Sequence, residues 1–202
     1  MTYKVYGFYG SRSLRVTWLL EELGQDYEFI HTRPHSKKAL DLNPSGKIPI
    51  LVDNGTPITD SAAICLYLSD KHFDKGLSAK CGTVERAKLD SWLHFAQSEF
   101  EAPLWTIRKH QMILPKELRA NVAPAAIYEF DNAMKALKQR MGDAPYAMGD
   151  HFSIADIFLT QIGQWARHTR MKIDNNFKQY LIRNWERPAL VRARTKEEQA
   201  EE

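Results

Sequence analysis

Asn-Pro-Ser-Gly-Lys-Ile-Pro-Ile-Leu-Val, residues 43–52, decides the fold of this chain together with the Asp60-Ser61 pair that follows it. Pro49 has no N–H group and precedes an apolar run, so it does not join a sheet ladder at that point. A proline also pushes the residue before it towards extended backbone, which leaves the N–H and C=O groups of Ile48 free for another partner. The stretch therefore predicts a loop that presents one extended residue and then enters a strand.

Four short apolar runs around this stretch read as strands. They cover residues 3–8, 27–30, 50–53 and 56–59. The last two are joined by Asn54-Gly55, a pair that suits the two-residue type I′ turn of a β-hairpin. We therefore expect the third and fourth strands to be antiparallel neighbours.

Two helices are predicted between these strands. Apolar residues from Val16 to Leu23 recur at i, i+3, i+4 and i+7, and Gly24 suits the end of a helix. A later helix begins at Asp60 or Ser61, either of which can cap its N-terminus. The order β-α-β followed by β-β-α needs parallel first strands and a right-handed crossover. It predicts a small mixed sheet with helices on its faces.

After residue 76 the strand patterns end and helical patterns follow. The predicted helices cover residues 84–112, 117–141, 153–169, 176–184 and 188–199. Pro103 is expected to kink or divide the first of them. The charged residues 196–202 read as a frayed end. We expect an α/β domain at 1–76 and an all-α domain at 84–202, joined by a linker at 77–83.

Composition limits the classes of function. The 202 residues carry 28 basic and 25 acidic side chains, a balance that predicts neither a nucleic-acid nor a membrane partner. No apolar run approaches the ~20 residues that span a bilayer, and the N-terminus does not resemble a signal peptide. Cys65 and Cys81 form no zinc pattern, and Pro34 separates His31 from His35, so no metal site is expected. The expected location is the cytoplasm.

The turn after the first strand, residues 9–13, leads directly into a helix. A helix N-terminus offers unpaired N–H groups and about half a positive charge, which favours an anion such as a thiolate. Ser11 and Ser13 add hydroxyl donors. The same residues also suit simple capping with Ser13 as the N-cap, and the local pattern alone favours capping.

The Asp60-Ser61 pair allows two interpretations in the same way. The N–H and hydroxyl of Ser61 can bind a carboxylate at the positive end of the helix dipole, beside an Asp60 that can pair with an ammonium group. Taken alone, the pair is more simply a helix cap, and Lys47 is a solvated lysine. The order and spacing of the features, rather than any one of them, indicate a ligand site.

In that order the features resemble the cytosolic glutathione transferases, of the bacterial type that uses a serine. The resemblance covers nearly the whole chain. It includes the 18–23 helix, the 43–49 loop and the capping-box spacing of Ser153 and Asp156. It implies a thioredoxin-like N-terminal domain and an all-helical C-terminal domain. It also implies a detoxifying enzyme that conjugates reduced glutathione to small hydrophobic electrophiles, with peroxidase side activity.

The resemblance assigns the residues of the 43–61 region to glutathione. Ile48 would pair its backbone with the cysteinyl part of the tripeptide, beside a cis Pro49. Asp60 and Ser61 would hold the γ-glutamyl end, and Lys47 would lie near the glycyl carboxylate. Glutathione would be the co-substrate, and no metal would take part.

The resemblance leaves the donor to the glutathione sulfur open. Matching Arg15 to the family's first helix puts Gly10 at the usual serine position and Ser11 one place later. We expect Ser11 to donate, with Tyr9 as its rival and Ser13 as a third candidate.

The helical half would supply the electrophile pocket, with Trp105 and Arg108 as lining residues, and the chain would form a homodimer. The alternative is a binding or regulatory module that keeps the fold without turnover. The intact 47–49 and 60–61 motifs favour the enzyme.

Overall fold

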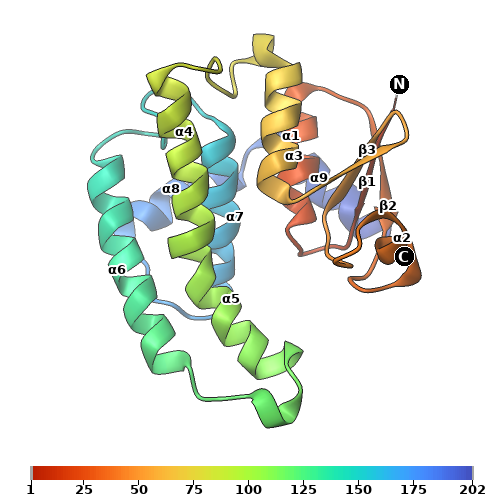
Figure 1. The fold of residues 1–202 in the computed structure, drawn as a ribbon. Helices are drawn as coiled ribbons and strands as arrows, with labels where there is room; N and C mark the ends of the chain where they lie inside the picture. Colours follow the sequence, from red (N-terminus) through yellow and green to blue (C-terminus); the bar gives the residue numbers. More distant parts are fainter. Residues whose placement is uncertain (1, 202) are drawn as a thin grey trace. The chain divides into compact units, whose positions relative to one another are not determined.

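The computed structural model describes residues 2–201, which form two compact units (Figure 1). One unit contains the described residues up to 80 together with those from 185 onward, and the other contains residues 81–184. The sequence pattern predicts a single helical domain at residues 84–202. The last helix instead groups with the sheet, because its apolar side packs on a helix of the first unit.

The first unit is built on a four-stranded mixed sheet in the order β2-β1-β3-β4. Its strands are β1 (Tyr3–Gly7), β2 (Tyr27–His31), β3 (Ile50–Asp53) and β4 (Thr56–Thr59). β1 runs parallel to β2 and antiparallel to β3, and β3 pairs antiparallel with β4. The predicted βαβ-ββα order is confirmed. Asn54 and Gly55 both have positive φ, as the predicted type I′ hairpin turn requires.

The first unit also contains α-helices. They are α1 (Ser13–Leu23), the short α2 (Lys37–Leu42), α3 (Ser61–Lys71) and α9 (Pro188–Gln199). α1 lies beside α3, and both contact the sheet, while α9 packs on α1 and reaches β2 (Figure 1). The predicted apolar side of α1 is fully buried, and Gly24 ends the helix in the left-handed conformation.

The second unit is helical. It contains α4 (Val84–Phe95), α5 (Ala102–Arg108), α6 (Ala123–Met141), α7 (Ile154–His168) and α8 (Asn175–Trp185, of which Trp185 groups with the other unit). A π-helical segment, Ala96–Glu101, separates α4 from α5 directly before Pro103, so the predicted break is confirmed. The predicted start of α6 at residue 117 is wrong. Residues 119–122 are not helical, and Pro124 lies in the first turn of α6, where its missing N–H costs nothing.

Asp156 connects the second unit internally. Ser153 and Asp156 form the predicted capping box at the start of α7. The buried Asp156 carboxylate also accepts hydrogen bonds from the Ala147 backbone and the Tyr180 hydroxyl, both at 2.8 Å. Burial raises its pKa, while these donors lower it. Within residues 2–201 no helix is long and apolar enough to cross a membrane.

Candidate functional site

The loop before β3 presents Ile48 as predicted. The Ile48–Pro49 peptide bond is cis, Pro49 is buried and Lys47 is exposed. Neither backbone group of Ile48 pairs with another of the described residues. The loop is held by the Asn43 side chain, whose Nδ2 donates to the Lys47 carbonyl at 2.8 Å. The structure therefore leaves the N–H and C=O of Ile48 available to a peptide-like ligand.

The start of α3 combines a helix N-terminus with a buried cation. Asp60 has φ 71°, an unusual value for a residue with a side chain, and its carboxylate accepts from the Ala62 N–H at 2.9 Å. Ser61 is 4% exposed, and its hydroxyl accepts from Nη1 of Arg15 at 3.2 Å. Strained backbone of this kind persists where the surrounding structure enforces it, and it is concentrated at binding sites. The arrangement favours an anion at Ser61.

Two serines shape the turn between β1 and α1. The Ser11 Oγ accepts from the Ser13 N–H at 3.1 Å and lies 2.7 Å from the Ser13 Oγ. Ser13 is fully buried, and its hydroxyl donates to the Phe8 carbonyl at 3.1 Å. The buried position of Ser13 requires a glycine at residue 7, since an added Cβ on Gly7 would lie 2.4 Å from the Ser13 Cβ. Ser11 is therefore the more accessible hydroxyl of the pair.

The capping interpretation of Ser13 is wrong in detail. Ser13 is the first residue of α1 rather than its N-cap, and Arg12 occupies the N-cap position without a side-chain cap. The Ser11 hydroxyl instead accepts a hydrogen bond from the N–H of Ser13. The remaining N–H groups of this helix start are the ones that favour an anion.

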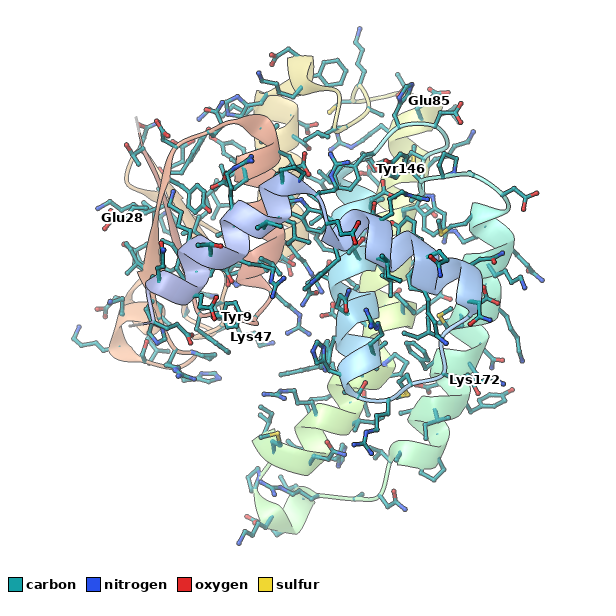
Figure 2. The ribbon with its side chains drawn as sticks, turned by 180° about the vertical axis from the view of Figure 1, so that it is seen from behind. Tyr9, Glu28, Lys47, Glu85, Tyr146 and Lys172 are labelled. Carbon is teal, nitrogen blue, oxygen red and sulfur yellow. The ribbon has the colours of Figure 1, made fainter. Side chains whose placement is uncertain are left out.

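Tyr9 forms hydrogen bonds with α9 and with the residues that follow it. Its N–H donates to Oε1 of Glu201 at 2.9 Å, and its hydroxyl accepts from Nη2 of Arg194 at 3.5 Å. Tyr9 lies beside the last turn of α9, and Lys47 lies at the same end of the unit (Figure 2). The Tyr9 hydroxyl accepts this bond and keeps its own proton, so Tyr9 stays a rival of Ser11 as a donor.

Strand register brings three of these segments together. Tyr6 pairs with Ile50, and Ile50 pairs with Thr59. The turn after β1, the loop before β3 and the start of α3 thus leave the sheet at the same end. Ser11, Ile48 and Ser61 belong to these three segments, as the sequence analysis expected. The two predicted pocket residues lie on α5 in the other unit, where Trp105 is half-buried and Arg108 is exposed.

Two buried charged residues of the first unit, Arg15 and Glu197, were not predicted from the sequence pattern. Arg15 is 0% exposed behind Ser61. Glu197 is also 0% exposed, and it accepts from the Thr17 Oγ1 at 2.8 Å. The expectation of a frayed end at 196–202 is therefore wrong, because α9 continues to Gln199 and turns Glu197 inward. The position of Arg15 within the apolar stretch of α1 was the one sequence feature that indicated its burial. Glu197 lies in a run of charged residues, so its burial could not be predicted from the pattern.

Cys65 belongs to the core, as the absence of a cysteine motif indicated. It is fully buried, and its Sγ lies 3.7 Å from the Arg15 carbonyl. Burial raises the pKa of this thiol to about 12, against a smaller lowering by the Arg15 charge. It is therefore not a nucleophile at neutral pH.

Comparisons with known proteins agree with this geometry. The glutathione S-transferase N-terminal domain matches residues 5–76, and the glutathione S-transferase C-terminal domain matches residues 120–190. A probable glutathione S-transferase of Nicotiana tabacum is 30% identical over 166 residues, which cover 80% of this chain and 70% of that protein. Glutathione S-transferase GstA of Escherichia coli O157:H7 is 24% identical over 190 residues, covering 90% of this chain and 92% of that one.

Solved structures extend the likeness to nearly the full length. A sphingomonad glutathione S-transferase complexed with glutathione has a TM-score of 0.81 and 28% identity, and the match covers 96% of this chain and 98% of that one. The two matched domains occur in the order in which the sheet unit and the helical unit follow each other along the chain. The chain therefore belongs to the glutathione S-transferase family of enzymes.

Proposed function

We propose that this enzyme conjugates reduced glutathione to small hydrophobic electrophiles through an activated thiolate. The observation that carries the proposal is the strand register, because it brings the segments of Ser11, Ile48 and Ser61 to one end of the sheet. To bind a tripeptide such as glutathione, a site needs backbone hydrogen-bond partners, an anion-binding group and a donor to the thiol close together. In this proposal Ile48, Ser61 and Ser11, in that order, offer these groups.

The γ-glutamyl end of glutathione binds at the start of α3 in this proposal. Its carboxylate meets the Ser61 N–H and hydroxyl, with the Arg15 guanidinium behind them. Asp60 pairs with the γ-glutamyl ammonium group. A charge-assisted hydrogen bond contributes about 1.5–3 kcal/mol, so this end supplies much of the affinity. Ile48 pairs with the cysteinyl part, and Lys47 lies near the glycyl carboxylate.

Activation of the thiol requires only modest stabilisation. A free thiol has a pKa of about 8.5, and lowering it by ~2 units needs about 2.7 kcal/mol. One hydroxyl donor to the thiolate supplies roughly 1.5–3 kcal/mol, and a helix N-terminus adds about 0.3–1 kcal/mol. Ser11 at the start of α1 therefore suffices as a donor. It does not act as a nucleophile, and no general base is needed.

The rest of the proposal follows from family membership. Residues 1–76 bind glutathione, and the helices that follow the 77–83 linker supply the electrophile pocket with Trp105 and Arg108 in its wall. The protein acts as a cytoplasmic homodimer in detoxification, with peroxidase activity as a side reaction. Sedimentation at micromolar concentration tests the dimer.

The test combines calorimetry with a conjugation assay on the Ser11→Ala variant. Loss of one donor to a thiolate is expected to lower kcat roughly 10- to 100-fold, while glutathione still binds. Ser98→Ala is the matched control, because Ser98 is exposed and its hydroxyl donates only to the His94 carbonyl. Unchanged turnover in Ser11→Ala would move the donor role to Tyr9. No glutathione binding by the wild type at millimolar concentration would favour the non-catalytic module.

A further inference from the structure

The turn between β1 and α1 is a four-residue β-turn that runs from Phe8 to Ser11. The Ser11 N–H donates to the Phe8 carbonyl at 3.2 Å, which closes the turn. Gly10, its third residue, has φ 77°, close to the value that a type II turn requires at that position. The closing bond uses the first carbonyl and the last N–H, so the N–H of Tyr9 needs a partner from elsewhere.

A carboxylate that follows α9 supplies this partner. The Tyr9 N–H donates to Oε1 of Glu201 at 2.9 Å, across 192 positions of the chain. Nδ1 of His31, at the end of β2, lies 3.5 Å from the same oxygen. One carboxylate oxygen of Glu201 therefore meets both the β1–α1 turn and the neighbouring strand.

The backbone that carries Glu201 is itself well supported. Its N–H donates to the Glu198 carbonyl at 3.1 Å, which continues the chain in a turn beyond the end of α9. α9 packs on α1, and Arg187 and Arg192 of α9 pair with glutamates of α1. The helix therefore brings the Glu201 carboxylate to the turn from a fixed position in the same unit.

A single peptide group links the Glu201 contact to Ser11. The C=O of Phe8 and the N–H of Tyr9 belong to one planar unit, which rotates as a whole. Its C=O accepts from the Ser11 N–H at 3.2 Å and from the Ser13 hydroxyl at 3.1 Å. Its N–H donates to Glu201. Rotation of this peptide would therefore break the Glu201 bond and both serine bonds together.

The turn depends on these bonds because packing does not hold Gly10. A Cβ added to Gly10 would meet no atom within 4 Å, so this residue borders open space. Glycine also adopts more backbone conformations than any other residue. Ser11 follows Gly10 directly, and its position is therefore set by the hydrogen bonds of the turn rather than by neighbours of Gly10.

We propose that Glu201 is a positioning residue that fixes the Phe8–Tyr9 peptide and, through it, the placement of Ser11 at the glutathione sulfur. The inference rests on the proposed function, since it requires the donor to the sulfur to lie on this turn. The glutathione-binding groups at Ile48 and Ser61 lie on other segments. Glu201 therefore acts on the step that uses the thiolate and not on the affinity for glutathione. Its carboxylate accepts one hydrogen bond and transfers no proton.

Glu201→Ala removes the acceptor of the Tyr9 N–H. The released turn populates other arrangements, and kcat falls with the fraction of molecules in which Ser11 is correctly placed. We expect kcat to fall about 3- to 10-fold, while the dissociation constant of glutathione stays within about twofold of the wild type. The Glu201 side chain is 31% exposed, so its truncation leaves the core intact. A loss of affinity as large as the loss of kcat would overturn the positioning role.

Glu201→Gln tests the hydrogen bond separately from the charge. The amide oxygen of glutamine still accepts from the Tyr9 N–H, while the charge beside His31 is removed. Glu201→Gln is therefore expected to keep kcat within about twofold of the wild type. Glu198→Ala is the matched control, because the Glu198 side chain is exposed and only its backbone carbonyl meets Glu201. It is expected to keep the wild-type kcat.

Hydrogen exchange of the turn amides gives a readout that does not depend on turnover. The Tyr9 and Ser11 N–H groups are both hydrogen-bonded. In Glu201→Ala both are expected to exchange at least about threefold faster, because the peptide that joins their bonds is released. NMR exchange rates of wild type, Glu201→Ala and Glu198→Ala measure this. An unchanged rate at Ser11 in Glu201→Ala would overturn the positioning role.

The outcomes separate this inference from the proposed function. If Ser11→Ala lowers kcat but Glu201→Ala keeps the wild-type value, the positioning role is overturned and the function stands. If Glu201→Gln is as slow as Glu201→Ala, the bond to Tyr9 is not the cause, and the positioning role is also overturned. If Ser11→Ala and Tyr9→Phe both keep the wild-type turnover, or the wild type does not bind glutathione, both are overturned.

Discussion

Arg15 is a buried charge directly behind the proposed carboxylate site at Ser61. Its guanidinium is enclosed in the first unit and donates to the Ser61 hydroxyl at 3.2 Å. Taking such a cation out of water costs several kcal/mol, which a ligand anion can partly offset. The start of α3 alone offers only about half a positive charge. In the proposed site, we expect the full charge of Arg15 behind Ser61 to increase the selectivity for a carboxylate.

Arg15→Met is therefore expected to weaken glutathione binding at least tenfold, because it keeps the length of the side chain and removes the charge. Isothermal titration calorimetry measures the dissociation constant. Arg192→Met serves as the control, since Arg192 is more than half exposed and pairs with Glu21 at the surface of the unit. Equal affinity in wild type and Arg15→Met would show that the Arg15 charge does not contribute to glutathione binding.

Local patterns predicted the residues whose roles are local. Asp60, Ser61 and Ile48 take their conformation from the residues next to them, so a cap and a proline were enough to predict that conformation. Arg15 and Glu197 take their roles from distant contacts. The Thr17–Glu197 hydrogen bond joins residues 180 positions apart. No periodicity within one helix carries that information.

At the scale of the element, α9 is the helix whose place the sequence did not reveal. Its pattern predicted a helix at 188–199, which is confirmed, but helical periodicity does not say which neighbour covers the apolar side. Its partners on α1 determine its place. Arg187 at the start of α9 makes two hydrogen bonds to Glu22, at 2.6 and 2.9 Å. The Trp18 indole nitrogen donates to the same carboxylate at 2.8 Å.

Arg187→Ala is expected to destabilise the first unit by about 1–3 kcal/mol, because Glu22 is mostly buried and would lose its charged partner. Urea unfolding of Arg187→Ala, Glu22→Gln and the double variant measures the coupling, for which we expect about 1 kcal/mol. Lys37→Ala is the control and should change stability by less than about 0.5 kcal/mol, since the Lys37–Asp41 pair is exposed. A coupling near zero would mean that apolar packing alone holds α9 on α1.

At the scale of the whole molecule, the sequence predicted all four strands, their directions and the helical nature of the second unit. The first 60 residues contain many strand and turn patterns close together. Each predicted strand is therefore supported by the predicted turn or strand next to it. Unit boundaries are less visible, because they depend on which surfaces meet rather than on chain order. Residues from 185 onward return to the sheet unit for that reason. The same return brings Glu197 into the unit that carries the candidate site.

Burial of Glu197 also makes the stability of the molecule depend on pH. Its pKa is about 8 in the folded state against an ordinary value of 4.5, so the folded state holds one more proton between these limits. The free energy of unfolding therefore falls as pH rises from about 5 to about 8, by up to about 1.4 kcal/mol per pH unit from this group. Asp53 and Asp174, whose pKa values are lowered, act in the opposite sense and only in the acid range.

Glu197→Gln removes this proton uptake and is expected to flatten the decline in stability between about pH 5 and about pH 8. Urea unfolding of wild type and variant at several pH values across that window measures the two slopes. Glu198→Gln should keep the wild-type slope, because that side chain is exposed in the folded state. Equal slopes in wild type and Glu197→Gln would mean that Glu197 is ionised in the folded protein at neutral pH.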